Sequence, residues 1–572
     1  MPIQPQYEVL DTLFQRKLFV IPNYQRAYSW RKAHRDDLFD DIETLASHPD
    51  TRHHFLASIV AVSTYVEETI GTTLFQTYEV VDGQQRLTTL VILLKAIANH
   101  LDDQVRIEHE EKQLLNSLLV KGDSRVVLLQ GNHDSSLILR NYLEEGTVPP
   151  HTEITTIARK NVRDAIGECE AFVAGWKTRR PVLQLLSIIK NRLGFVFYQL
   201  SDRGSVYTVF EVLNSRGLDV EHLDKCKSML MGIAYEKMPG DIFAQTEREL
   251  HQIWTDIFRL LGRRQINGDE ILMFASTLFG GEERARRMNP EDSVESFREQ
   301  CLLDPRKTIV VSQRLQRVTA KIVELEEKPE WSAVTKIVHA RLLAIAILLR
   351  SDIIDKSRLL EQWENVSFRI FGMQGKDSRS KGGEYTKLAT NIMAKTTGYI
   401  SESEILGQLI VLGRDHPVAE SVIFLTNTDC YNGWENDFRY FIFKYERFLS
   451  QSQGARISEE AWNKIWAMSP SKSIEHIYPQ HPGLLAPRLQ NHDANIHRIG
   501  NLTILTPELN SEASNLVFER KKEKYRNSGL LVNRSILLKP DGTERNQWLD
   551  QEIALREAEL LAFAQIQWKD LQ

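Results

Sequence analysis

The sequence predicts an α+β protein that is predominantly helical, with its strands grouped towards the two ends of the chain. Short apolar runs at 53–65, 77–83 and 194–200 have the composition of strands. Residues 236–450 have helical periodicity almost throughout. Near the C-terminus, an apolar stretch at 502–505 precedes helix-forming residues, which predicts a small β-β-α unit within a helical domain.

The length of 572 residues allows several domains with buried cores. We expect three: an α/β domain at 1–235, a helical connecting domain at 236–450, and a C-terminal domain at 451–572. The last of these closes with a helix from about Arg545 to Trp568. Hydrophobic residues make up 42% of the chain and charged residues 26%, which is ordinary for a globular protein.

The apolar segments argue against a membrane protein. No apolar run reaches the roughly 18–20 residues that span a bilayer. The longest candidate, at 87–98, is expected to form a buried helix. The N-terminus lacks the basic start and the apolar core of a signal peptide. The expected location is therefore the cytoplasm, without a membrane partner.

The spacing of the cysteines and the net charge limit the classes of protein to which this chain can belong. The four cysteines are Cys169, Cys226, Cys301 and Cys430. They lie far apart without a CxxC pair, which argues against a zinc ribbon and a disulfide framework. The net charge of −6 means that any contact with nucleic acid must come from local basic patches. The tracts at 520–526 and 375–383 are candidates, although each alone is also typical of a solvated surface.

Four polar residues near the C-terminus stand in an order that suits one-metal phosphodiester hydrolysis. Glu475 and His476 precede a Tyr-Pro break, Asn501 opens the apolar stretch, and Asn510 lies nine residues later. A histidine can take a proton from water, while carboxylate and amide oxygens hold a divalent cation. This order and spacing fit a ββα-metal (HNH) finger, in which the middle asparagine braces the loop.

Within this finger we expect Glu475 and Asn510 to bind the metal, and such oxygen donors favour Mg²⁺ or Mn²⁺ over zinc. His476 would be neutral and oriented through its other ring nitrogen by a backbone or amide oxygen. Lys521, or its neighbour Lys522, would steady the scissile phosphate. The alternative is a structural finger with a packed histidine and turn-capping asparagines.

The motif VVDGQQRLTT predicts a strand, a tight Asp-Gly turn and a long helix. Such a turn exposes backbone N–H groups that favour an anion. Asp82 can bind a metal or activate water, and Gly83 lets the backbone approach a phosphate. Arg86 can pair with phosphate, while Gln84 and Gln85 can orient water or read a base edge. The alternative is a helix-opening turn with a surface arginine.

Aromatic residues interleave with an arginine in the segment Tyr24–Trp30. Ring faces beside a cation suit stacking on a base or enclosing an altered chemical group. Tyr24, Arg26, Tyr28 and Trp30 are therefore candidates for a pocket that senses a modification. In the alternative reading, Tyr28 and Trp30 belong to the core and Arg26 is a buried salt-bridge partner.

These motifs resemble those of the GmrSD-type, modification-dependent (type IV) restriction enzymes. The segment EHIYPQ…HRIGNLTILTPELNSEASNLVFERKKEKY is similar to their C-terminal nuclease domain over about 460–530. The segments IPNYQRAYSW, VVDGQQRLTT and FEVLNSRGLDVEHLDKCK stand in the order of their N-terminal ParB/sulfiredoxin-like domain. The helices between the two ends add little motif evidence.

The resemblance implies that the N-terminal domain binds a nucleoside triphosphate. Its Asp-Gly-Gln-Gln-Arg motif is associated with hydrolysis that licenses or resets cleavage. The resemblance also implies that a second turn closes the same pocket, with Asn214 and Arg216 reaching phosphate or ribose. For that turn, an ordinary helix–turn–helix corner is an equal alternative. The aromatic segment is associated with nucleotide binding or with the sensing of modified DNA.

The expected function is an NTP-regulated, metal-dependent endonuclease that restricts modified phage DNA, carrying glucosylated or hydroxymethylated cytosine or phosphorothioate linkages. Its partners would be double-stranded DNA and ATP, GTP, UTP or CTP. Cleavage of both strands with one finger per chain favours a homodimer. The alternative is a nucleotide-binding DNA sensor or effector with non-specific nuclease activity and no NTP hydrolysis; RNA cleavage is a weaker one.

Overall fold

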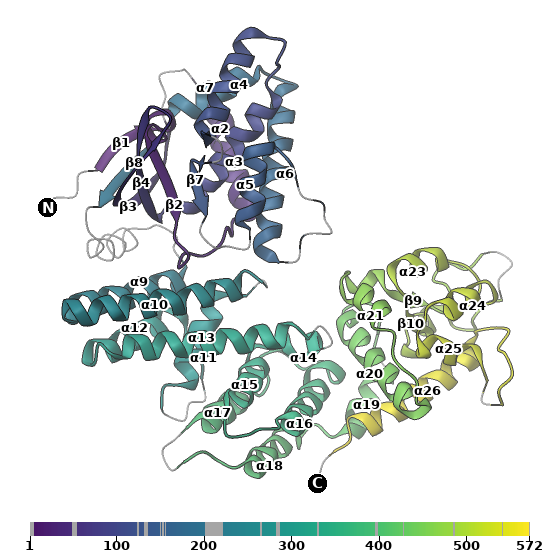
Figure 1. Ribbon diagram of the computed structural model, residues 1–572. Helices are drawn as coiled ribbons and strands as arrows, with labels where there is room; N and C mark the ends of the chain where they lie inside the picture. Colours follow the sequence, from purple (N-terminus) through teal and green to yellow (C-terminus); the bar gives the residue numbers. More distant parts are fainter. Residues whose placement is uncertain are drawn as a thin grey trace. The chain divides into compact units, whose positions relative to one another are not determined.

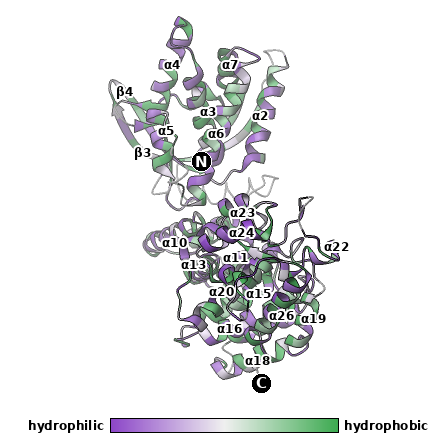
Figure 2. Cartoon of the chain, turned by 90° about the vertical axis from the view of Figure 1, so that its right-hand side faces the viewer, coloured by the Kyte–Doolittle hydropathy of each residue, from purple (hydrophilic) through white to green (hydrophobic). Residues whose placement is uncertain are grey.

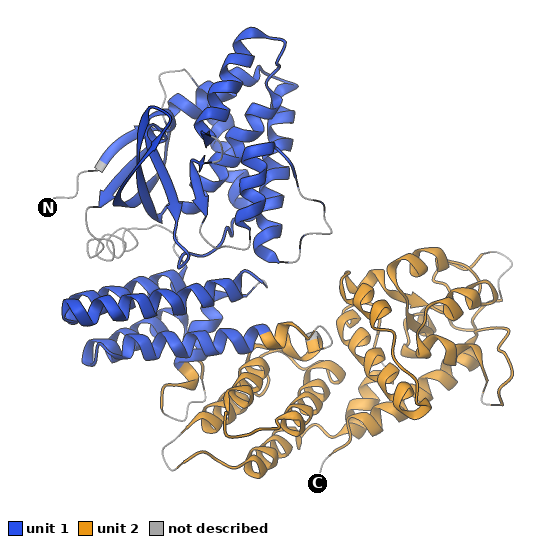
Figure 3. Cartoon of the chain, viewed as in Figure 1, with its two compact units in different colours: residues 1–276, 288–323 blue, residues 277–287, 324–572 orange. Residues whose placement is uncertain are grey.

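The computed structural model divides into two compact units, shown in Figures 1 and 3. Unit 1 comprises residues 1–276 and 288–323, and unit 2 comprises residues 277–287 and 324–572. The predicted division into three domains stays a prediction. The structure describes residues 5–48, 54–122, 125–130, 135–148, 150, 154, 156–200, 221–263, 266–281, 286–328, 331–394, 398–426, 428–483, 487–539 and 541–570.

Among the described residues, unit 1 contains a six-stranded mixed sheet with the strand order β1-β8-β3-β4-β2-β7. The strands β1/β8 and β3/β4 pair antiparallel, and the other neighbours pair parallel. The predicted α+β class and the predicted strands are confirmed, because β3, β4 and β8 cover those runs. The strands are β1 (Pro5–Val9), β2 (Lys17–Ile21), β3 (His54–Ile70), β4 (Thr73–Asp82), β7 (Leu128–Gln130) and β8 (Leu193–Leu200).

Helix α3 (Gln84–His100) lies at the centre of the helical layer of unit 1, where most of its side chains are buried. It packs against α4, α5, α6 and α7. The predicted buried helix at 87–98 is therefore confirmed. The surrounding short elements and helices are α1 (Leu10–Leu13), α2 (Lys32–Ala46), α4 (Arg106–Leu119), β5 (Val120–Lys121), β6 (Arg125–Val126), α5 (Ser136–Glu145), α6 (Ile157–Lys177) and α7 (Val182–Arg192).

The middle of the chain is helical, as the periodicity predicts. Figure 2 shows hydrophobic and hydrophilic residues interleaved along its helices, as amphipathic packing requires. The helices are α9 (His222–Lys237), α10 (Gly240–Leu261), α11 (Gly268–Leu278), α12 (Pro290–Leu303), α13 (Lys307–Glu326), α14 (Ser332–Thr335), α15 (Val338–Leu349), α16 (Ser357–Ser367), the π-helix η3 (Phe368–Met373), α17 (Gly382–Met393), α18 (Glu402–Gly413), α19 (Val418–Thr426) and α20 (Glu435–Gln453).

The C-terminal part of unit 2 holds a short hairpin among helices (Figure 1). Strands β9 (Ile474–His476) and β10 (Leu502–Ile504) pair antiparallel. Ile477, Tyr525, Trp548 and Ile553 belong to the buried apolar cluster beside them. No described helix is long and apolar enough to cross a membrane. The remaining elements are α21 (Glu459–Trp466), η4 (Pro470–Lys472), α22 (His492–Asn495), η5 (Ile499–Asn501), α23 (Pro507–Ala513), α24 (Phe518–Asn527), α25 (Leu531–Leu537) and α26 (Asp550–Gln567).

Candidate functional site

The β9–β10 hairpin presents Glu475 and His476 at the end of its first strand. His476 pairs with Leu502 and Glu475 pairs with Thr503 across the hairpin. Because successive side chains of a strand point to opposite faces, the carboxylate and the imidazole face different surroundings. Both side chains are buried. The hairpin therefore separates the two groups into two environments.

On one face, Glu475 forms an ion pair with a lysine from α24. The Lys521 ammonium lies 2.6 Å from Oε1 of Glu475 and also donates a hydrogen bond of 2.6 Å to the carbonyl of His476. The Tyr525 hydroxyl donates to the same carboxylate oxygen at 3.5 Å. Burial raises the pKa of Glu475 to about 7, while the Lys521 ammonium acts in the opposite direction. The backbone N–H of His476 also acts on this carboxylate and lowers its pKa.

Lys521 itself is fully buried. Burial lowers the pKa of its ammonium, and Glu475 opposes that shift. The structure thus places this lysine on the carboxylate and not on an open surface. Its neighbour Lys522 is also buried and pairs with Glu519 at 2.7 Å. The predicted contact of either lysine with a DNA phosphate stays a prediction.

On the other face, His476 lies against a second histidine. Its Nε2 is 3.0 Å from Nδ1 of His497, and the side-chain amide of Gln480 lies 3.4 Å from the same Nε2. Burial lowers the pKa of His476 to about 3, helped by His497 and Lys521, so the ring is neutral at pH 7. We expected a backbone or amide oxygen to orient the ring through one of its nitrogens. At Nε2 the nearest partner is instead an imidazole nitrogen, with the Gln480 amide further away.

Tyr431, from the connection before α20, completes this ring cluster. It stacks on His497 with the ring centroids 5.2 Å apart and an interplanar angle of 7°. It meets His476 edge-on at 4.5 Å. Sequence reasoning missed Tyr431 because it lies 45 residues before His476 and carries no motif. The one feature of the sequence that could have pointed to Tyr431 is that an aromatic residue lies within a polar connection.

Asn501 holds the loop between the two strands. Its Oδ1 accepts a hydrogen bond of 2.8 Å from the backbone N–H of Tyr478. Its Nδ2 donates to the carbonyls of Tyr478 at 3.2 Å and Ile496 at 2.9 Å. The side chain is fully buried. These bonds tie the start of the loop to its end.

Asn510 lies on α23, where its Nδ2 donates to the carbonyl of Lys472 at 2.9 Å. Its Oδ1 is buried and has no hydrogen-bond partner among the described residues. Within the described chain, no hydrogen bond joins Asn510 to Glu475 or His476. The described residues also contain no group of three or more His, Cys, Asp or Glu side chains suited to a metal ion. The unpaired Oδ1 of Asn510 is thus a buried acceptor on α23, and the predicted binding of a metal by Glu475 and Asn510 stays a prediction.

In unit 1, the Asp-Gly turn joins β4 to α3 as predicted. Gly83 precedes the helix with φ of +94°, a conformation that side chains rarely adopt. A Cβ at this position would lie 3.1 Å from Cγ1 of Ile59 and 3.3 Å from the carbonyl of Ser58. Glycine is thus required both by conformation and by space.

The two glutamines that follow are buried. Gln85 accepts a hydrogen bond of 2.9 Å from the backbone N–H of Ser29 and donates one of 3.3 Å to the carbonyl of Ala27. The hydroxyl of Thr88 donates to the backbone carbonyl of Gln84 at 2.8 Å. Gln85 therefore ties the aromatic segment to α3, and its predicted roles towards water or a base stay predictions.

Arg26 forms ion pairs with two acidic residues, Glu221 just before α9 and Asp224 in its first turn. It pairs with Glu221, and its Nε lies 3.4 Å from Oδ2 of Asp224. Burial raises the pKa of Asp82, which Arg86 opposes. Oδ1 of Asp224 is buried without a hydrogen-bond partner among the described residues. The structure thus brings motif residues together with acids more than 130 positions away in sequence.

Lys227 of α9 is a buried cation that sequence reasoning missed. Its Nζ donates to Oε1 of Gln25 at 3.2 Å and to the carbonyl of Tyr24 at 3.4 Å. It also lies 5.5 Å from the ring centroid of Tyr24 and 5.3 Å from that of Phe258. Burial lowers the pKa of Lys227 to about 8, while Asp224 acts in the opposite direction.

The three aromatic residues of the segment Tyr24–Trp30 have different surroundings. Tyr28 is buried, and its hydroxyl bonds to that of Thr89 at 2.8 Å. Tyr24 stacks on His251 at 4.1 Å, and Trp30 stacks on His34 at 6.0 Å. Tyr28 thus follows the core alternative, and the partly buried Trp30 packs against the same core cluster. Tyr24 is also partly exposed.

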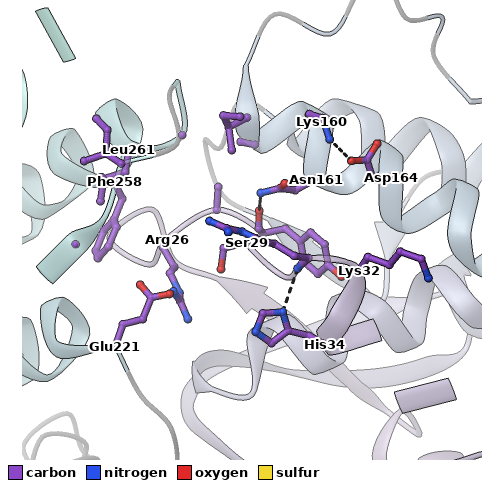
Figure 4. Close-up of a pocket in the computed structure, with 18 of the residues that line it drawn as sticks. Arg26, Ser29, Lys32, His34, Lys160, Asn161, Asp164, Glu221, Phe258 and Leu261 are labelled. Carbon is purple, nitrogen blue, oxygen red and sulfur yellow. Dashed lines mark hydrogen bonds and ion pairs between the residues drawn. The ribbon is translucent and has the colours of Figure 1, made fainter. Parts of the chain in front are cut away.

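Two neighbouring cavities, of about 530 Å³ and 580 Å³, adjoin this segment within unit 1. Figure 4 shows Arg26 and Glu221 facing one another beside Phe258 and Leu261. Arg26, Ser29 and His34 line both cavities, and Arg86 lines the second. The predicted residues Asn214 and Arg216 lie outside the described residues. The motif arginines therefore face a space large enough for a small ligand.

The chain thus combines an α/β domain that has an Asp-Gly helix-opening turn with a C-terminal hairpin whose first strand ends in Glu475 and His476. Residues 10–231 match the N-terminal domain of the GmrSD restriction endonuclease, and residues 423–563 match the C-terminal domain of GmrSD restriction endonucleases. The chain therefore belongs to the GmrSD restriction endonuclease family. No curated protein sequence matches the chain.

Proposed function

We propose that this protein is a metal-dependent DNA endonuclease that cuts modified foreign DNA under the control of a nucleoside triphosphate. The observation that carries the proposal is the buried imidazole of His476, which directly follows the buried carboxylate of Glu475 on strand β9. The match of both ends of the chain to restriction endonuclease domains supports the nuclease assignment.

In the proposed reaction, the imidazole of His476 takes a proton from a water molecule. The resulting hydroxide forms a bond to phosphorus, and the bond from phosphorus to the leaving sugar oxygen breaks. The leaving oxygen takes its proton from solvent. A neutral ring is needed for the first step, which is the state that burial maintains at pH 7.

The oxygen donors of the finger fit a hard divalent cation. Oδ1 of Asn510 is a buried acceptor without a hydrogen bond from a described residue, and Glu475 supplies a carboxylate that Lys521 and Tyr525 contact through Oε1. We propose that these two residues hold Mg²⁺ or Mn²⁺. When bound, the ion would supply a Lewis acid for the scissile phosphate.

Unit 1 is proposed to bind the nucleoside triphosphate beside the Asp82–Arg86 turn. The support comes from the left-handed Gly83, which opens α3, and from Arg26 and Arg86, which line a cavity. A helix N-terminus and arginines are the groups that bind phosphates in proteins. The proposed substrate is double-stranded phage DNA with altered cytosines or phosphorothioate linkages, and a homodimer would supply one finger for each strand.

A cleavage panel tests this function. Unmodified, hydroxymethylated, glucosylated and phosphorothioate duplexes are incubated with the full chain and Mg²⁺, with and without each of the four NTPs. We expect cleavage of at least one modified duplex, dependence on NTP, and loss of cutting in excess EDTA. Equal cutting of all four duplexes would contradict the modification dependence. Cutting that persists in EDTA would contradict the metal requirement.

A further inference from the structure

We propose that His497 is a positioning residue for the base of this nuclease. Its Nδ1 accepts the Nε2–H of His476, which holds His476 in the tautomer whose Nδ1 can take a proton from water. This inference rests on the proposed function, because it assigns a partner to the proposed base. It concerns a residue that lies outside the Glu-His…Asn…Asn pattern of the finger.

The distances between the rings decide which nitrogen of His476 does the chemistry. Nε2 of His476 is already engaged, 3.0 Å from Nδ1 of His497. Among the described residues, no hydrogen bond engages Nδ1 of His476. The nitrogen that remains for water is therefore Nδ1. A neutral imidazole accepts at one nitrogen only when the other carries the proton. Nε2 must then be the donor, and Nδ1 of His497 the acceptor.

The surroundings of His497 hold its ring in place. Tyr431 stacks on it nearly in parallel, with an interplanar angle of 7°. The carbonyl of His497 accepts a hydrogen bond of 3.0 Å from the backbone N–H of Cys430. The preceding residue, Ile496, is held by Asn501 through its carbonyl. The acceptor is thus fixed by packing and by backbone bonds on both sides, as a residue that orients a base requires.

Nε2 of His476 has a second neighbour besides His497. The side-chain amide nitrogen of Gln480 lies 3.4 Å away, a longer contact than the 3.0 Å to Nδ1 of His497. Since an amide nitrogen only donates, the Nε2–H tautomer requires that the Gln480 amide turn its oxygen towards the ring.

Three substitutions at position 497 separate positioning from a general structural role. In His497→Asn the amide oxygen is attached to Cγ, as Nδ1 is in histidine, so an acceptor is kept near the same place. In His497→Gln the amide lies one bond further out, and in His497→Ala it is absent. We expect His497→Ala and His497→Gln to lower kcat by about 10- to 100-fold without changing KM for DNA, the range typical of groups that orient a catalytic ligand. His497→Asn should keep kcat within about threefold of the unsubstituted chain.

The substrate for these measurements is the duplex that the unsubstituted chain cuts fastest, and melting temperatures of all variants are compared. A His497→Asn variant as slow as His497→Ala would overturn the proposal. The proposal would also be overturned if the three variants raised KM and left kcat unchanged, because that outcome would assign His497 to phosphate binding.

A second measurement does not depend on cleavage. Nitrogen chemical shifts of ¹⁵N-histidine-labelled protein, assigned with His476→Ala, report which ring nitrogen of His476 carries the proton. We expect the Nε2–H tautomer in the unsubstituted chain and in His497→Asn, and a mixture of tautomers in His497→Ala. A predominant Nδ1–H tautomer in the unsubstituted chain would refute the assignment. If no duplex is cut, the nuclease proposal fails, while the tautomer result still decides the role of His497.

Discussion

The finger of unit 2 and the motif cluster of unit 1 both combine a buried carboxylate with cations, but they are assembled differently. Glu475, Lys521 and His476 lie within about fifty residues of one another, on one hairpin and the following helices. The cluster around Asp82 and Arg26 draws on elements more than 130 residues apart in sequence. The first arrangement follows from local order, whereas the second exists only because the segment after β2 contacts α9.

The two regions also differ in whether their polar groups already have partners. In the finger, Oδ1 of Asn510 has no hydrogen-bond partner among the described residues. In unit 1, Arg26 is paired with two acids, and Lys227 is held by Gln25. A ligand of the unit 1 cluster must therefore compete with existing ion pairs, while a cation in the finger would meet an unused acceptor.

The largest expected effect belongs to the finger. We predict that His476→Ala lowers DNA cleavage by about 10²- to 10⁴-fold, the range attributed to general-base catalysis, while NTP turnover is unchanged. Gel assays of cleavage and phosphate-release assays of turnover measure the two activities. His492→Ala is the matched control, because this histidine belongs to the same finger. Its Nδ1 lies 3.2 Å from Oδ1 of Asp493. Full cleavage by His476→Ala would refute the assigned base.

The next effect belongs to unit 1. Asp82→Ala or Arg86→Ala should lower NTP hydrolysis by about 10²-fold, because each removes a charged group beside the proposed phosphate site. Phosphate release at saturating NTP measures the loss. Arg125→Ala serves as control, since Arg125 pairs with Glu68 at 3.0 Å and does not line either cavity. Unchanged turnover in both cluster variants would move the site elsewhere.

A smaller, structural effect tests the local assembly of the finger. Asn501→Ala removes three buried hydrogen bonds, each worth about 1 kcal/mol, so the loop should open more easily by about 3 kcal/mol. Hydrogen exchange of the Tyr478 amide measures this opening, and its protection should fall by about 10²-fold. Asn510→Ala, which removes one bond from a partly exposed side chain, should change this protection little. Equal protection in Asn501→Ala would show that the hairpin needs no brace.

The smallest effect concerns the backbone of unit 1. Gly83→Ala places a Cβ 3.1 Å from Ile59 in a left-handed conformation, which should cost about 1–2 kcal/mol of stability. Gly167→Ala, inside α6 with nothing within 4 Å of the added carbon, should instead stabilise unit 1 by about 0.5–1 kcal/mol. Denaturant unfolding of the two variants compares them. Equal stability would mean that the turn relaxes to accept a side chain.

Sequence reasoning succeeded for elements that are formed by residues close in the chain. The strand before Asp82, the turn at Gly83 and the helix α3 were all read from short patterns. Local patterns suffice there because a strand, a tight turn and a helix each have their own periodicity and preferred residues. The same patterns said nothing about which groups would face one another.

Only the packing of the folded chain decided which side chains contact one another. The linear order of residues was enough to indicate the α+β class, the family and the elements that carry each motif. The ring cluster of Tyr431, His497 and His476, the burial of Lys521 on Glu475 and the capture of Arg26 by Asp224 followed only from the folded chain. Ion pairs and ring contacts depend on distances between elements, and burial alters the protonation of the groups involved, so neither property is written in any short segment.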